Sequence, residues 1–154
     1  MAEALEVLGG NGFVEESGMP RLYRQAPLNS IREGSGNVIA LDVLRAMGRG
    51  SGAPAAVTAE IEAARGVDDR FDGAVERLRS ELGDPEALPL RARRIAGLLA
   101  LCLLGSLLLR SAPAEVADTF CATRLGGDWG AVLGTLPAGA PVAAIVRRAS
   151  VPAT

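Results

Sequence analysis

Apolar residues return at every third or fourth position in two stretches of this chain. They are Val38, Leu41, Leu44 and Met47 in the first stretch, and Phe71, Val75, Leu78 and Leu82 in the second. Side chains at this spacing lie on one face of an α-helix, where they can pack against a core. We therefore predict amphipathic helices over 38–47 and within 68–83, the second begun by Asp68 and Asp69 as an N-cap.

Glycine and proline residues mark the limits of the other predicted helices. These helices cover 2–8, a short segment after Pro20, 54–66, a long segment from Asp84 and Pro85 to Leu109, 113–122 and 141–150. Proline fits the first turn of a helix and glycine commonly ends one. A second proline, Pro89, leaves open where the long helix begins. The predicted fold class is all-α, an antiparallel helical bundle.

Composition divides the chain into three parts. Residues 48–53 are rich in glycine and are predicted to be a flexible linker. Residues 1–47 form the region before this linker, and residues 54–154 form a second helical region after it. The first helix has no capping signal at its start, which indicates a chain truncated within a helix.

Residues 95–109 form an uncharged apolar run between Arg94 and Arg110. The run is shorter than the roughly 20 residues that a membrane-spanning helix needs, and it contains Gly97, Gly105 and Ser106. We predict a central bundle helix and no membrane partner. Because this helix is apolar on every face, it must be covered on every face by neighbouring helices or by another chain.

The absence of certain residue types limits the chemistry that the chain can carry out. It contains no His, which excludes imidazole bases and His-ligated metals. Cys102 and Cys121 form no C-x-x-C pattern and are predicted to be buried, reduced thiols. We expect no metal site and a cytoplasmic protein. Only 3% of the residues are aromatic, so the core is predicted to consist of Leu, Ala, Val and Ile.

Charge gives little indication of a nucleic-acid partner. The formal net charge is −2 and every basic residue is Arg. The arginines that could favour DNA are predicted to pair instead with acids on neighbouring helices; they are Arg91, Arg93, Arg94, Arg147 and Arg148. Surface salt bridges are predicted between the Glu15 and Glu16 pair and the arginines of 21–24, and Trp129 is predicted to anchor the C-terminal segment.

The segment Glu33-Gly34-Ser35-Gly36-Asn37 stands directly before a predicted helix. Glycines at such a place leave backbone N–H groups free to face an anion, and the helix adds the positive end of its dipole. Glu33 could then act as a general base if a larger structure covered it. The alternative is a simple glycine turn in which Ser35 or Asn37 caps the helix and Glu33 is exposed.

The run EALEVLGGNGFVEESGMPRLYRQAPLNSIREGSGNVIALDVLRAM, residues 3–47, closely resembles the C-terminal helical domain of the acyl-CoA dehydrogenase family. Its parts EESGMPRLYR, NSI-x-EGSGN and LDVLRAM are most similar to the AidB-type branch, which is linked to the adaptive response to alkylation. The later stretches RFDGAVERL and ADTFCATRLGG resemble the additional C-terminal helices of that branch.

This resemblance implies FAD-dependent α,β-dehydrogenation of acyl-CoA thioesters, in which a carboxylate removes the α-proton and hydride passes to the flavin. The base of the family falls on Glu33. The strip that lies against FAD falls on Asn29, Ser30, Gly34, Ser35, Gly36 and Asn37. The loop that meets the flavin nucleotide of a neighbouring subunit falls on Glu6, Gly9 and Gly10.

The chain departs from the family pattern in two ways. Arg32 stands where Tyr or Trp usually precedes the catalytic glutamate, and the family's N-terminal helical domain and middle β-domain have no counterpart here. Activity would therefore require a homo-oligomer or a chain that supplies the missing domains, and acyl-CoA would bind only to the completed site. The alternative is a non-catalytic helical module for oligomerisation or partner binding, with DNA binding as a third and weaker hypothesis.

Overall fold

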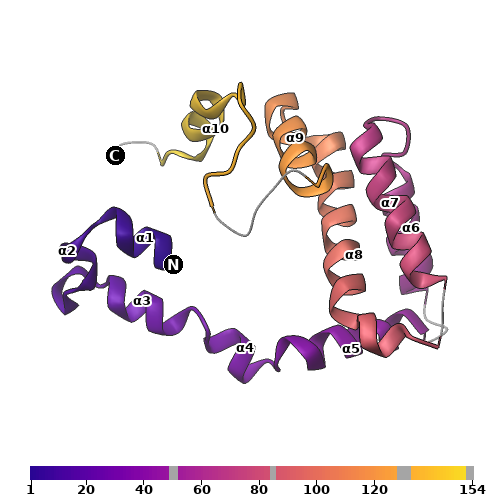
Figure 1. Ribbon diagram of the computed structural model, residues 1–154, viewed down its shortest axis with the longest axis horizontal. Helices are drawn as coiled ribbons and strands as arrows, with labels where there is room; N and C mark the ends of the chain where they lie inside the picture. Colours follow the sequence, from indigo (N-terminus) through magenta and orange to yellow (C-terminus); the bar gives the residue numbers. More distant parts are fainter. Residues whose placement is uncertain (49–51, 84–85, 128–132, 152–154) are drawn as a thin grey trace. The chain divides into compact units, whose positions relative to one another are not determined.

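The computed structural model describes residues 1–48, 52–83, 86–127 and 133–151, and the regular structure within these ranges is entirely helical (Figure 1). The predicted all-α class is thereby confirmed. The chain forms two compact units, Met1–Ile39 and Ala40–Thr154. The predicted boundary at residue 47 stays a prediction, since part of the expected linker lies outside the described residues.

The first unit consists of short helices. They are α1 (Ala2–Val7), α2 (Gly10–Phe13), the 3₁₀ turn η1 (Glu15–Ser17), α3 (Met19–Gln25) and α4 (Leu28–Arg32). Helix α1 packs against both α2 and α3. Gly12 permits this packing, because a Cβ atom there would lie only 2.5 Å from the carbonyl oxygen of Leu5.

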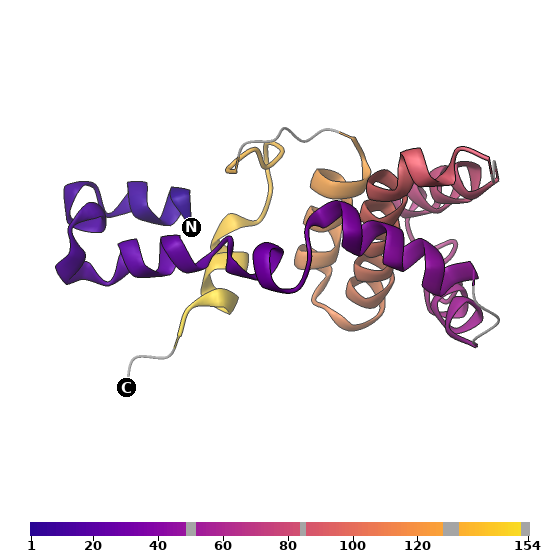
Figure 2. The ribbon, with the colours of Figure 1, turned by 90° about the horizontal axis from the view of Figure 1, so that it is seen from below.

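The second unit contains the longer helices. Helix α5 (Gly36–Gly48) begins in the first unit and ends in the second; it is followed by α6 (Ala53–Glu62), α7 (Asp69–Leu82), α8 (Leu88–Ser111), α9 (Ala114–Phe120), the π-helical turn η2 (Cys121–Leu125) and α10 (Val142–Ala149). Helices α6 and α7 both pack along α8, as Figures 1 and 2 show. The π turn contacts α7, α8 and α9.

The core of the bundle is built on the predicted apolar stripe of α7. Phe71, Val75 and Leu78 are buried, and Leu82 packs against them at the edge. Gly105 of α8 faces Phe71 so closely that a Cβ atom there would lie 2.9 Å from the ring carbon Cδ2. The neighbouring Ser106 is fully buried, and its hydroxyl donates a 2.5 Å hydrogen bond to the carbonyl oxygen of Glu60 in the last turn of α6.

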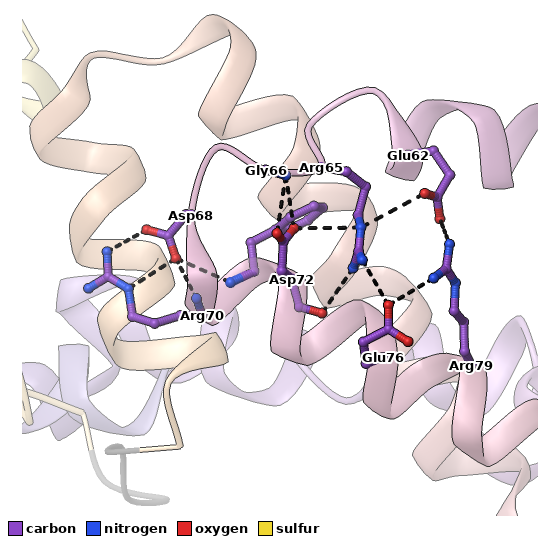
Figure 3. A network of polar contacts seen from close by, with 9 residues as sticks. Glu62, Arg65, Gly66, Asp68, Arg70, Asp72, Glu76 and Arg79 are labelled. Carbon is purple, nitrogen blue, oxygen red and sulfur yellow. Dashed lines mark hydrogen bonds and ion pairs between the residues drawn. The ribbon is translucent and has the colours of Figure 1, made fainter.

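The turn into α7 is fixed by polar contacts (Figure 3). Asp68 is the N-cap, as predicted, and its carboxylate accepts hydrogen bonds from the backbone N–H groups of Arg70 and Phe71. The guanidinium of Arg70 also donates to Asp68 at 2.6 Å, and this contact holds the pKa of Asp68 below its usual value. Arg70 further pairs with Asp118 of α9 at 2.6 Å, so the cap of one helix is tied to another.

A second set of ion pairs joins the end of α6 to α7. Arg65 donates to Glu76 at 2.8 Å, and Arg79 donates to both Glu62 and Glu76 (Figure 3). The side chains are partly exposed, so each pair contributes modestly. Asp72 completes the turn by accepting hydrogen bonds from the N–H of Gly66. Gly66 lies in the turn that follows α6 and has a φ of +79°, a conformation that favours glycine.

Three predicted helix limits are corrected or completed by the structure. The helix predicted over 54–66 ends at Glu62, so its predicted end is wrong. The start of the long helix, which the two prolines left open, is at Leu88, with Pro89 in the first turn, where its missing N–H and its ring are harmless. The helix predicted to end at Ala122 is α-helical to Phe120 and continues as the π turn, with the N–H of Gly126 bonded to the carbonyl of Cys121 at 2.8 Å. Asp84, Pro85 and Trp129 lie outside the described residues.

Both cysteines are buried and unpaired with each other, as predicted. Burial raises the pKa of the Cys102 thiol and of the Cys121 thiol to about 11. Such thiols are poor nucleophiles because only the thiolate reacts. They are therefore core residues.

Helix α8 is covered on one face only. Ala92, Ile95, Cys102, Gly105 and Ser106 face the bundle core, whereas Leu90, Leu104 and Leu107 on the opposite face are exposed. Within the described residues, α8 is the one helix long and apolar enough to cross a membrane, and 28% of its most apolar 18-residue window is buried. The sequence predicts that α8 is covered on every face, but the described part of this chain covers only the inward face.

Candidate functional site

The predicted site begins with a short helix and a tight turn in the first unit. Pro27 precedes α4 and accepts a 2.8 Å hydrogen bond from the hydroxyl of Ser30. Asn29 accepts a 2.9 Å bond from the N–H of Glu33, which ends the helix. Gly34 then adopts a φ of +108°. Only glycine takes this conformation without strain, and it turns the chain into α5.

The start of α5 presents backbone N–H groups. The carbonyl of Ser35 accepts the first helical hydrogen bond from the N–H of Ile39, at 3.0 Å. The helix begins at Gly36, so the N–H groups of Gly36, Asn37 and Val38 belong to its first turn, where helical partners are lacking. At the start of a helix of 13 residues, these groups provide a local positive potential that suits a phosphate or another anion.

The side chains of this turn are open to solvent. Arg32, Glu33, Ser35, Gly36 and Asn37 are exposed. The carboxylate of Glu33 is therefore available for contact, but within the described residues it is not enclosed. The turn thus provides one wall of a binding site and does not provide a closed pocket.

The second group of predicted residues lies near the N-terminus. Glu6 is in α1, Gly9 is the N-cap of α2 with a φ of +58°, and Gly10 is the first residue of α2. Glu6 lines a cavity of about 390 Å³ together with Leu5, Phe13, Glu15, Pro20, Tyr23, Arg24 and Ala2. The described lining does not include Glu33, so the two groups of predicted residues form separate surfaces of the same unit.

The cavity contains residues that sequence reasoning missed. Phe13 and Tyr23 are 80% and 50% exposed although both are aromatic. The signal in the sequence is that two of the few aromatic residues fall within the glycine-rich first segment. Arg24 and Glu15 in the lining form a bidentate pair, at 2.9 and 3.0 Å. This pair lowers the pKa of Glu15 and confirms one predicted surface salt bridge.

Two other hypotheses about chemistry can be examined in the described ranges. These ranges contain no group of three or more Cys, Asp or Glu residues that could hold a metal ion. Of the arginines considered for DNA, Arg91 and Arg94 both pair with Glu81, at 3.1 and 2.6 Å. The prediction that such arginines pair with acids is confirmed for these two.

Comparison with known proteins finds a family match for the first part of the chain. Residues 1–48 match the acyl-CoA dehydrogenase C-terminal domain, so this part of the chain belongs to the acyl-CoA dehydrogenase family. Over 126 residues, or 81% of its length, the chain is 43% identical to the putative acyl-CoA dehydrogenase AidB of Escherichia coli (strain K12). It is also 47% identical over 45 residues to acyl-CoA dehydrogenase family member 11 of Caenorhabditis elegans.

These matches support the resemblance to the C-terminal domain of acyl-CoA dehydrogenases of the AidB type, and the similarity to AidB extends well beyond the first unit. The chain spans only 23% of the length of AidB and 7% of the length of the nematode protein.

Proposed function

We propose that this chain provides the C-terminal part of an FAD-dependent acyl-CoA dehydrogenase of the AidB type, within an assembly in which other polypeptide supplies the remaining domains. The observation that carries the proposal is the Glu33 to Asn37 turn, where a carboxylate, a glycine of positive φ and the start of α5 follow one another. The match of residues 1–48, which include this turn, to the acyl-CoA dehydrogenase C-terminal domain supports the proposal.

The residues of this turn are suited to form one wall of a flavin-binding site. The first turn of α5 would hold an anionic or polar edge of FAD through backbone N–H groups, and Gly34 and Gly36 allow close backbone approach. When bound, the flavin supplies an acceptor for the hydride that leaves the β-carbon of an acyl-CoA thioester. Asn29 and Ser30 of α4 lie on the same strip, and Glu6, Gly9 and Gly10 would meet the nucleotide of a neighbouring subunit.

Glu33 would act as the base in the completed site. Its carboxylate would take the α-proton of the thioester, and cover by the other domains of the family would remove water from around it. Correct placement of such a base contributes roughly 10²–10⁴ in rate. Arg32, in place of an aromatic residue, would put a guanidinium beside the flavin.

The deciding experiment uses a chimera in which this chain replaces the matching C-terminal segment of E. coli AidB. The visible absorption spectrum is recorded before and after addition of FAD, and then after addition of an acyl-CoA. We expect a protein-bound flavin band that bleaches with acyl-CoA. The Glu33→Gln variant should keep the flavin band and bleach at least about 100 times more slowly.

Two substitutions at Ser35 test the contact with the flavin itself. Asp and Asn are both good N-cap residues, so Ser35→Asp and Ser35→Asn should leave α5 equally stable. Only Asp places a negative charge at the start of the helix, and it should weaken FAD binding by about tenfold or more relative to Asn. A chimera without bound flavin, or equal binding by the two variants, would refute the proposed flavin contact.

A second candidate function is supported by the exposed apolar face of α8. In this alternative the chain is a non-catalytic helical module for oligomerisation or partner binding. A chain that associates stably, while its chimera binds no flavin, would favour this alternative.

A further inference from the structure

The exposed face of α8 has a regular sequence pattern. Residues at alternating steps of three and four along the helix are all exposed; they are Leu90, Arg93, Gly97, Ala100, Leu104, Leu107 and Ser111. A repeat of 3.5 residues keeps side chains in line along one seam of a helix, as in coiled coils. We call these seven residues the α8 seam.

The α8 seam is separate from the face that packs into the bundle. Helix α8 packs against α6, α7 and α9, and its inward residues Ile95 and Cys102 belong to the buried core, whereas the seam is exposed within the described residues. Leu90 is 91% exposed, and Leu104 and Leu107 are nearly half exposed. A Cβ atom at Gly97 would meet nothing within 4 Å. The seam therefore presents an apolar strip with a shallow centre at Gly97 and Ala100.

We propose that the α8 seam is the interface of a two-fold symmetric dimer, in which α8 packs antiparallel against α8 of a second copy of this chain. The seam is self-complementary in this arrangement. Centring the two helices on Ala100 places Gly97 opposite the partner's Leu104 and Leu90 opposite the partner's Ser111. In each of these layers a small residue faces a large one, as close packing requires.

Charge supports the antiparallel direction. Arg93 faces the partner's Leu107, so its aliphatic stem covers the leucine while its guanidinium reaches the edge of the interface. In a parallel pair Arg93 would face the partner's Arg93, and Gly97 would face glycine and leave a gap. Arg94 and Arg110, which border the seam, are each paired within their own chain, with Glu81 and Glu60.

The interface has the symmetry that two-fold dimers require, because the same patch serves both copies. It explains why residues 95–109 lack charged side chains on the exposed face as well as on the buried one. The proposal concerns α8 of the second unit and does not depend on whether the first unit binds a flavin.

Sedimentation of the whole 154-residue chain over a range of concentrations tests the association. We expect a reversible monomer–dimer equilibrium. Leu104→Arg should raise the dimer dissociation constant by about tenfold or more, since it puts two charges into the interface. Val67→Arg is the matched control, because Val67 is 61% exposed and lies outside α8; it should leave the dissociation constant unchanged.

Engineered cysteines test the direction of packing, with Cys102 and Cys121 too buried to interfere. Ala100→Cys should form a disulfide-linked dimer on oxidation, and so should the double variant Leu90→Cys with Ser111→Cys. Leu90→Cys alone should form none. Crosslinking by Leu90→Cys alone would indicate a parallel pair and overturn the proposal. So would a chain that stays monomeric at every concentration, or one that dissolves only in detergent as a monomer.

Discussion

Replacing Gly105 with alanine tests how closely α8 packs against α7. An alanine Cβ would lie 2.9 Å from Cδ2 of Phe71 and 3.1 Å from Cδ1 of Leu125, and both side chains are essentially fully buried. Overpacking of this kind costs roughly 1–3 kcal/mol. Alanine in place of glycine within a helix restores about 0.5–1 kcal/mol. We therefore expect Gly105→Ala to lower the free energy of unfolding by up to roughly 2.5 kcal/mol.

Gly73 of α7 provides the matched control. A Cβ atom there would meet only the Arg77 side chain, at an ordinary distance of 3.7 Å. Gly73→Ala should therefore raise the free energy of unfolding by about 0.5–1 kcal/mol. Both variants are measured by urea unfolding followed by far-UV circular dichroism, and the difference between them isolates the packing cost. Equal stabilisation by the two substitutions would refute the close contact between Gly105 and Phe71.

Three further predictions concern the same bundle. Ser106→Ala should cost about 1–3 kcal/mol, because the carbonyl of Glu60 would lose the hydrogen bond that the buried Ser106 hydroxyl donates. Cys102 and Cys121 should not react with iodoacetamide at neutral pH until the chain unfolds, since burial raises their pKa to about 11. Arg70 lowers the pKa of Asp68 in the folded state. The contact between the two side chains therefore adds to the free energy of unfolding at pH values above 3.8, the pKa of Asp68 in the unfolded chain, and this contribution is lost as the pH falls below that value. Asp68→Asn should remove this part of the acid dependence of the unfolding free energy.

Controls for these predictions come from neighbouring exposed positions. Ser80→Ala in α7 should change the stability by less than about 0.5 kcal/mol, and a comparable effect at Ser106 would exclude a role for its hydrogen bond. Asp69→Asn should leave the acid dependence of the unfolding free energy unchanged, since the contact between Asp68 and Arg70 is retained. Rapid alkylation of both thiols in the folded chain would show that the core is open to solvent.

The helices of this fold are largely predictable from sequence because their determinants are local. The stripe of Phe71, Val75 and Leu78 has a helical period, and all three residues are buried. Asp68 precedes this stripe with a side chain suited to capping, and it does cap the helix. The start of α8 is harder to predict, because Pro85 and Pro89 would both suit the first turn of a helix and the sequence does not show which of them lies there.

Contacts between distant residues could not be predicted in the same way. The sequence shows that Gly105 and Ser106 interrupt an apolar run, but it does not name Phe71 or Glu60 as their partners. At the candidate site the positive φ of Gly34 follows from the residue type, whereas the exposure of Glu33 depends on which other polypeptide lies above it. The cavity beside Glu6 was missed because α1, α2 and α3 must fold together before its wall exists.

The two opposite faces of α8 have a consequence for how this sequence can evolve. A helix at the surface of a monomer usually tolerates many polar replacements on its outer face. Here the inward face contains Ile95 and Cys102 and the outward face contains Gly97 and Leu104, so neither side is free to accept charge. Neutral drift along residues 95–109 should be confined to exchanges between apolar residues of similar size. The rate of substitution at Leu104 should therefore match that of a core residue, although its side chain is exposed in a single copy of the chain.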